Sequence, residues 1–137
     1  MSVLNQTGNK WVVIIVSSVI FSLMHSGNPS MGWLSYLNLF LVGLLFAYMF
    51  VKSKNLWLSI GYHITWNYFE GPVLGFQVSG LDQSSMYTVK NVGSNMVTGG
   101  NFGPEAGIIV TLVVFLGFVY LWKFYRPADD SLNAYKY

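Results

Sequence analysis

Residues 33–51 read WLSYLNLFLVGLLFAYMFV, nineteen positions without a charged side chain. At 1.5 Å per residue, a helix of this length spans roughly 28 Å, about the thickness of a bilayer core. Apolar runs in the cores of soluble proteins are usually shorter than this. The segment therefore predicts a membrane-spanning helix.

The composition of the whole chain points the same way. Of 137 residues, 53% are hydrophobic and only 9% are charged, whereas soluble domains carry about a quarter charged residues. Aromatic residues, at 18%, suit a protein whose Trp and Tyr side chains lie at lipid headgroups. A net charge of +2 without a basic stripe argues against a nucleic-acid partner. The absence of cysteine excludes disulfides, thiolate nucleophiles and cysteine-based metal sites.

Apolar segments on both sides of residues 33–51 extend this prediction to the rest of the chain. Turn-forming or polar residues at 26–32 and 52–55 separate them, and residues 70–105 form a long loop rich in Gly and Ser. We expect an all-α integral membrane protein with about four transmembrane helices in residues 1–126 and a polar tail in 127–137. The three additional segments are 11–24, 56–69 and 106–124.

The distribution of positive charge supports four crossings. With both chain ends on one side of the membrane, six of the seven Lys and Arg residues fall on that side, and only Lys90 falls on the other. By the positive-inside rule, both termini of this multi-pass protein are then cytoplasmic. The six residues are Lys10, Lys52, Lys54, Lys123, Arg126 and Lys136.

The two histidines are the candidate functional residues. His25 closes the first segment in FSLMH (21–25), and His63 lies in HITWN (63–67), where Asn67 shares its helix face. An ionisable group at membrane depth indicates a functional site, although each imidazole could simply bond a backbone carbonyl or a serine between packed helices. Imidazoles can bind a metal with Asn67 as a weak ligand or orienting group, or a histidine and an amide can stabilise an oxyanion. Either chemistry lacks a carboxylate.

These motifs resemble the CPBP family, which comprises CAAX prenyl endopeptidases and bacteriocin-processing or self-immunity (Abi-like) membrane proteins. FSLMH matches the family's FxxxH motif, HITWN matches HxxxN, and GGNFGPEAG at 99–107 is similar to its bacterial members. The resemblance covers roughly residues 11–122. It implies an intramembrane endopeptidase of a bacterial cell membrane that cuts a peptide or a prenylated protein.

The resemblance also implies roles for three residues. In the family, a glutamate of an EExxxR motif activates water together with the FxxxH histidine, which is His25 here. The HxxxN pair, His63 and Asn67, is assigned either to oxyanion stabilisation or to metal binding. His25, His63 and Asn67 are thus the expected catalytic residues, and His25 and His63, with Asn67, are the expected ligands if a divalent metal such as zinc is bound.

The chain departs from the family pattern because it has no EExxxR motif. Its first acidic residue is Glu70 and its only arginine is Arg126. It therefore resembles the C-terminal half of such a protease, and we expect it to be inactive without the N-terminal half. Glu70 shares the face of His63 and Asn67, but Gly71 and Pro72 follow it, so we expect a solvated carboxylate.

The second glutamate has a structural explanation. Pro104 and Glu105 suit the first turn of the last helix, where a missing N–H and a negative charge are both tolerated.

Depth in the membrane provides a test of the shared site. Counted from the basic side, His63 lies about 10 Å deep and His25 about 21 Å deep at 1.5 Å per residue, so tilt or a longer first helix must bring them together.

Two other functions fit the same residues. One is a non-catalytic immunity factor or partner subunit, and the other is a membrane anchor with haem b between the two histidines.

Overall fold

The computed structural model describes residues 9–89 and 96–126. Apart from an isolated bridge between Val78 and Leu81, the described residues form no β-structure, so the all-α prediction is confirmed. Lys90 and the tail at 127–137 lie outside the described residues. The α-helices are α2 (Lys10–Leu23), α3 (Trp33–Ser53), α4 (Trp57–Tyr68) and α5 (Ile108–Lys123), and the short helices are η1 (Phe69–Val73), η2 (Gly100–Phe102) and η3 (Pro104–Ala106).

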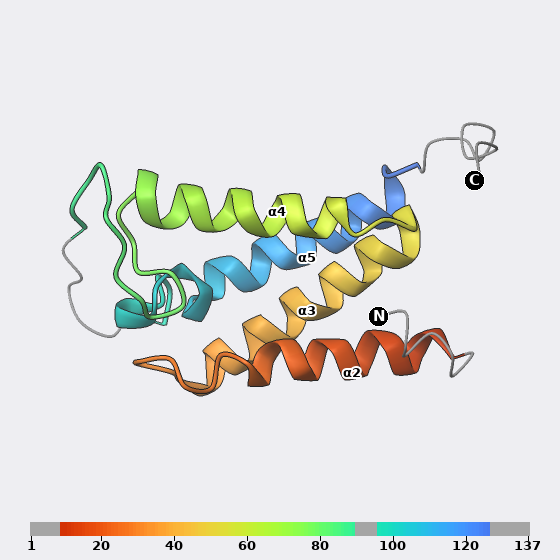
Figure 1. Cartoon of the computed structure of the whole chain (residues 1–137), viewed down its shortest axis with the longest axis horizontal. Coiled ribbons are helices and arrows are strands. Elements are labelled where there is room, and N and C mark those ends of the chain that lie inside the picture. The colour runs from red at the N-terminus through yellow and green to blue at the C-terminus, as the bar shows by residue number, and fades with distance from the viewer. Residues whose placement is uncertain (1–8, 90–95, 127–137) are drawn as a thin grey trace.

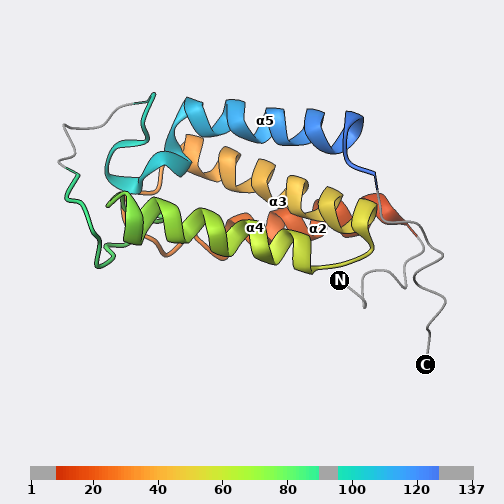
Figure 2. The same cartoon turned by 90° about the horizontal axis from the view of Figure 1, so that it is seen from above.

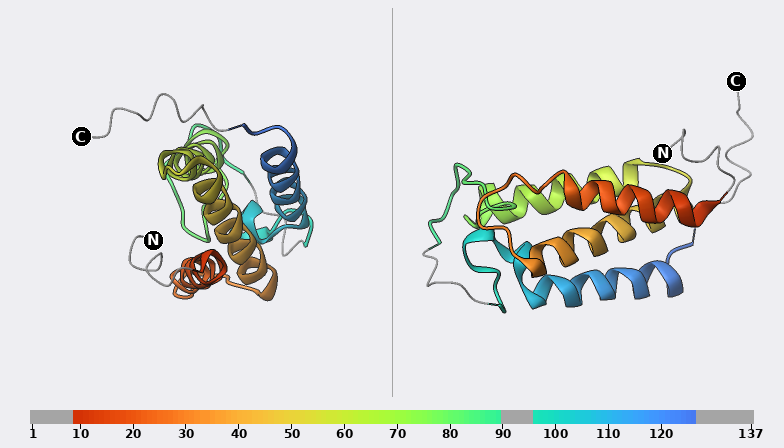
Figure 3. Two further views of the ribbon diagram at one scale, coloured as in Figure 1. Left: turned by 90° about the vertical axis from the view of Figure 1, so that its right-hand side faces the viewer. Right: turned by 90° about the horizontal axis from the view of Figure 1, so that it is seen from below.

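Helix α3 occupies the centre of the molecule and contacts α2, α4 and α5 (Figure 1; Figure 3, left). Its contact with α2 is close because small residues face each other. A Cβ atom on Gly43 would lie 2.8 Å from the Cα of Ser18, and small residues let helix backbones approach in this way in membranes. Ser22 adds a hydrogen bond of 3.1 Å from its Oγ to the carbonyl of Tyr36.

Helix α5 buries little of its apolar surface. The core cluster lies between α3 and α5, yet α5 buries only Val110, Val114 and Leu121 of its 16 residues. Leu112, Phe115 and other large side chains of α5 are exposed. A helix that is apolar on all sides and exposed on most of them suits a lipid environment.

Only α3, with 21 residues, is both long and apolar enough to cross a bilayer by itself among the described residues. Helices α2 and α5 are apolar but shorter. The structure is thus that of a helical protein with one clear candidate span, and four crossings stay a prediction.

The two ends of the molecule differ in charge. At one end lie the start of α2, the link between α3 and α4, and the end of α5 (Figures 1 and 2), and these segments carry all five described Lys and Arg residues. We call this the basic end. The turn at residues 24–32 and the segments 69–89 and 96–107 form the other end, the loop end (Figure 1), which carries all three described carboxylates, Glu70, Asp82 and Glu105.

The start of the last helix differs from the prediction. Pro104 and Glu105 belong to η3, a separate turn, and α5 begins only at Ile108. Gly107 separates them with an extended backbone, φ −101° and ψ 151°. A Cβ atom on Gly107 would lie 2.4 Å from the carbonyl oxygen of Val97. The close approach of the Val97 backbone therefore places the break between η3 and α5 at Gly107.

Candidate functional site

His25 lies in the turn that follows α2. Its Nδ1 lies 2.8 Å from the carbonyl oxygen of Phe21, one turn earlier. A carbonyl oxygen can only accept, so Nδ1 carries the proton and Nε2 keeps a lone pair. The half-buried ring is thus oriented by its own helix, with Nε2 free to act as a base.

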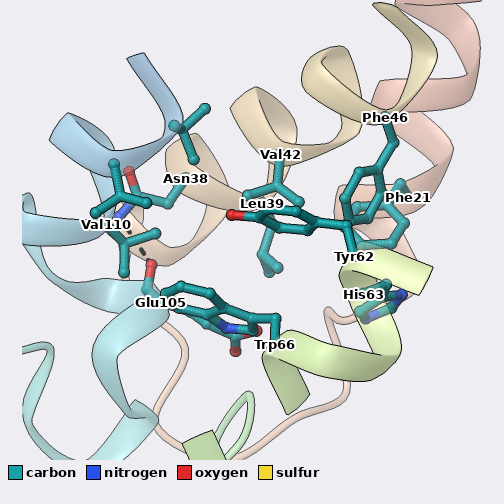
Figure 4. A pocket seen from close by; sticks show the side chains of 12 residues that line it. Phe21, Asn38, Leu39, Val42, Phe46, Tyr62, His63, Trp66, Glu105 and Val110 are labelled. Atoms are coloured by element: carbon teal, nitrogen blue, oxygen red, sulfur yellow. Dashed lines mark hydrogen bonds between the residues drawn. The ribbon is translucent and has the colours of Figure 1, made fainter. Parts of the chain in front are cut away.

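The phenyl ring of Phe21 joins the two histidines. Its centroid lies 4.9 Å from the ring of His25 and 5.7 Å from the ring of His63. Phe46 of α3 closes the cluster, with its ring 5.5 Å from His63 (Figure 4). The depth difference expected from sequence is therefore bridged, because one aromatic side chain reaches both imidazoles.

Asn67 lies one turn beyond His63 on the same helix and is also half-buried. Its Oδ1 is buried and has no hydrogen-bond partner among the described residues. A buried acceptor without a donor costs about 1–3 kcal/mol, so such an atom usually bonds a water, an ion or a ligand. Rotation of the amide by 180° would present its NH2 group at the same place.

Two cavities flank α4. The smaller, of about 20 Å³, is lined by His63, Glu105, Asn38 and nine other residues (Figure 4). The wider, of about 590 Å³, is mainly apolar and includes Glu70 in its lining. Tyr62 and Trp66 line both cavities, and their rings are stacked at 6.4 Å and 7°. This aromatic pair therefore forms the wall that separates the two spaces.

Glu70 is buried, and the prediction of a solvated carboxylate is wrong. Only 4% of its surface is exposed, because the chain folds back over the end of α4: the backbone N–H of Phe76 donates to the carbonyl of Glu70 at 3.0 Å. Neither carboxylate oxygen has a hydrogen-bond partner of ordinary geometry among the described residues. Gly71 and Pro72 do not fray the helix but continue it as the π-helix η1.

Glu105 is also buried, at 8% exposure, and has a defined partner. The hydroxyl of Ser79 donates to its Oε2, and Asn28 of the first turn donates to the carbonyl of Ser79 at 2.9 Å. Ser79, in the loop after α4, therefore joins Glu105 of η3 to the turn after α2, and Glu105 is not a first-turn acid of α5.

Asn38 of α3 fixes the backbone around Glu105. Its Nδ2 donates to the carbonyls of Glu105, at 2.8 Å, and Gly107, at 2.9 Å. Its Oδ1 accepts from the hydroxyl of Thr111 at 2.7 Å. Asn38 is completely buried and fully engaged, which makes it a structural residue at the loop end.

The two carboxylates are neighbours. A Cβ atom on Gly103 would lie 3.6 Å from Oε1 of Glu70 and 1.9 Å from the carbonyl of Gln77, so only glycine lets the segment before Glu105 approach so closely. Burial raises the pKa of Glu70 to about 9, and the negative charge of Glu105 adds to the rise, while the Trp66 indole opposes it. Burial also raises the pKa of Glu105, but hydrogen bonds from Ser79 oppose that rise.

The sequence indicates no functional role for these two glutamates. The one signal available was the pattern GGNFG at 99–103, since clustered glycines mark close backbone approach. Gly99, Gly100 and Gly103 all have positive φ. The pattern could have indicated that residue 105 is packed inside the protein.

The donor set does not fit a zinc ion. Zinc sites in proteins have at least three protein ligands, and no group of three or more His, Asp, Glu or Cys side chains among the described residues is placed to hold a metal. The haem alternative is not supported either, since a porphyrin between two axial histidines needs a flat slot. Instead, both imidazoles pack against Phe21.

The family model of type II CAAX prenyl endopeptidases, Rce1-like, matches residues 1–69. Neither a curated protein nor a solved structure matches the chain. The family match includes both FSLMH and HITWN. Since it covers half of the 137 residues, the chain belongs to the Rce1-like family of type II CAAX prenyl endopeptidases, whose members are embedded in membranes.

Proposed function

We propose that this protein carries an intramembrane endopeptidase site, with His25, His63 and Asn67 as catalytic residues, that hydrolyses a peptide bond in a membrane-associated or prenylated substrate. The observation that carries the proposal is the contact of one ring, Phe21, with both histidines. It supports a single site built from the FxxxH and HxxxN motifs, whose histidines lie 38 positions apart in the sequence.

The roles follow from the environment of each side chain. His63 and Asn67, one turn apart, stabilise the oxyanion that forms as the peptide carbonyl is attacked. His25, with Nδ1 engaged, offers Nε2 as a hydrogen-bond acceptor that orients the attacking water. The stacked rings of Tyr62 and Trp66 limit the access of water from the wide apolar cavity.

The proposal includes four membrane crossings with the basic end in the cytoplasm. It is supported by the five Lys and Arg residues gathered there and by the exposed apolar surfaces of α2 and α5. The neighbours of α3 have fewer than 20 residues each and can cross only where the bilayer thins locally. Labelling of engineered cysteines from each side of the membrane tests the four crossings.

Peptidase activity is tested with the full chain in proteoliposomes and a farnesylated peptide that ends in a CAAX sequence. We expect His63→Ala and Asn67→Ala each to lower kcat/KM by roughly 100-fold or more, as removal of an oxyanion donor does. Ile64→Ala is the matched control, because Ile64 adjoins His63 on the exposed face of the same helix.

The same assay is repeated with a separate segment that carries an EExxxR motif. A protein that binds substrate but cleaves it in neither assay, and whose histidine variants behave like the Ile64→Ala control, would instead be the non-catalytic immunity or partner subunit. That result would end the peptidase proposal.

A further inference from the structure

We propose that Glu105 and Glu70 are the base and the acid of one hydrolytic pair, with Glu105 acting on a water beside His63 and Glu70 acting on the leaving amine. This inference rests on the proposed peptidase function. It replaces the expectation, drawn from the missing EExxxR motif, that the chain alone is inactive, because the pair supplies the carboxylate that the motif would provide.

Burial and isolation are the first reason. Glu70 and Glu105 are 4% and 8% exposed, and carboxylates are rarely buried without a partner because desolvation of the charge is costly. No Lys or Arg of the described chain lies at the loop end to neutralise them. Two adjacent buried carboxylates with no Lys or Arg beside them, and with only His25 acting on Glu105, are expected to share one proton.

The second reason is that the two environments are unequal. Ser79 donates a hydrogen bond to Glu105 and so favours its charged form, whereas Glu70 has only the weaker support of the Trp66 indole and no partner of ordinary hydrogen-bond geometry among the described residues. The proton therefore resides on Glu70. A pair of titratable groups driven apart in this way is how enzymes obtain an acid and a base from the same residue type at one pH.

The third reason is access. Glu105 lines the cavity of about 20 Å³ that also contains His63, and a cavity of roughly 10–15 Å³ or more accommodates one water if polar partners are present. The amide of Asn38 is already engaged, so Glu105, His63 and Tyr62 are left to bind that water. Figure 4 shows the Trp66 indole beside Glu105 on the side of this cavity.

Glu70 lies beside the other space, with both of its carboxylate oxygens buried. It lines the apolar cavity of about 590 Å³, which has the size and the character of a small-ligand site. Trp66 and Tyr62 form the wall between the two cavities. The carboxylate pair therefore connects the small cavity, where the water binds, with the wide cavity, where the substrate binds. The scissile bond is placed at the edge of this wall.

The proton balance closes within the pair. Glu105 removes a proton from the water as its oxygen forms the bond to the peptide carbon. Glu70 gives its proton to the nitrogen as the C–N bond breaks, so an amine leaves and Glu70 becomes a carboxylate. The proton on Glu105 then passes to Glu70, which restores the starting state, and the acid product loses its proton to solvent.

The test uses the full chain in proteoliposomes with the farnesylated CAAX peptide. We expect Glu105→Gln to lower kcat/KM by roughly 100-fold or more, as loss of a general base does, and Glu70→Gln to lower kcat and remove the alkaline limb of the pH profile. Asp82→Asn is the matched control, since it removes an exposed carboxylate of the same loop end. The ionisable side chains of His25, His63 and Tyr62 also lie near the pair and are retained in all these variants.

Infrared spectroscopy provides a readout that does not depend on turnover. The wild-type protein should show the carbonyl stretch of a protonated carboxyl group at neutral pH, and this band should disappear in Glu70→Gln but persist in Asp82→Asn. A band that persists in Glu70→Gln, or is absent from the wild type, overturns the assignment of the proton. Helicity by circular dichroism shows that each variant is folded.

Failure of the inference differs from failure of the proposed function. If Glu70→Gln and Glu105→Gln cleave like Asp82→Asn while His63→Ala is inactive, the peptidase stands and the pair is not its acid and base. If cleavage needs the added EExxxR segment and Glu105→Gln has no effect there, the catalytic base comes from that segment and the role of Glu105 is ruled out. If the wild type cleaves in neither assay, the peptidase proposal fails and the catalytic roles of the pair fail with it.

Discussion

The basic end and the loop end differ in whether their ionisable groups lie at the surface or are buried. At the basic end, Lys ammonium groups lie over aromatic rings near the surface, at 5.5–5.8 Å from the ring centroids. At the loop end, Glu70 and Glu105 are buried and their surroundings are built from glycine contacts and side-chain hydrogen bonds. A surface charge needs little support and contributes little, whereas a buried charge constrains every residue around it.

The comparison predicts that stability depends on the loop end. Gly103→Ala should have the largest effect, because φ is +102° and the new Cβ would lie 1.9 Å from the carbonyl of Gln77. Backbone strain and overpacking together should cost about 4 kcal/mol or more, measured by denaturant unfolding in detergent. Gly27→Ala, in the turn of the same end, has no atom within 4 Å and should change little. Equal stability of the two variants would contradict the comparison.

Asn38→Ala should have the next largest effect. It leaves the carbonyls of Glu105 and Gly107 and the hydroxyl of Thr111 without their partner, at a cost of about 3 kcal/mol. Thr111→Val removes only one of these bonds and should cost about 1 kcal/mol. Thermal unfolding of the two variants measures the difference, and a cost for Asn38→Ala no greater than that for Thr111→Val would show that the backbone bonds do not matter.

Stability at the loop end should also depend on pH. The pKa of Glu70 is raised from 4.5 to about 9, so the folded protein holds this proton more tightly than the unfolded chain. The stabilisation is complete below about pH 4.5 and is lost as the pH rises towards 9. The melting temperature of the wild type should fall over this range relative to Glu70→Gln. A parallel pH dependence of the two proteins would mean that Glu70 is not responsible.

The smallest effect is expected at the basic end. Lys52→Gln removes the ammonium group 5.8 Å from the ring of Tyr48 and should cost about 0.5 kcal/mol. Lys123→Gln, with its ammonium group 5.5 Å from Phe124, serves as a second example. A loss as large as that of Asn38→Ala would erase the distinction between the two ends.

The helices could be predicted from sequence because each is a local apolar run. The expected segments 11–24 and 33–51 agree with α2 and α3 to within two residues at every boundary. The two histidines and Asn67 could be nominated because their motifs are local too. Their contact through Phe21 could not, since it depends on how α2, α3 and α4 cross.

The two glutamates could not be predicted for a related reason. Glu70 has Gly71 and Pro72 beside it, which locally favour a helix end and solvent. Its burial results from the chain that folds back at Phe76 and from Gly103, about 30 positions away, which packs against it. Its local sequence makes Glu105 typical of an acid in the first turn of a helix. The helix breaks at Gly107 instead, because Gly107 contacts Val97. In both cases, long-range packing overrides local preference.

Trp66, in the wall between the two cavities, can serve as a fluorescence reporter of the carboxylate pair. Of the five tryptophans, Trp11, Trp33, Trp57 and Trp122 are 61–73% exposed, whereas Trp66 is half-buried beside Glu70 and stacked on Tyr62. A lipid-soluble quencher should therefore suppress the emission of the first four and leave that of Trp66. The residual emission would then follow the proton of the carboxylate pair in real time, in the unlabelled protein.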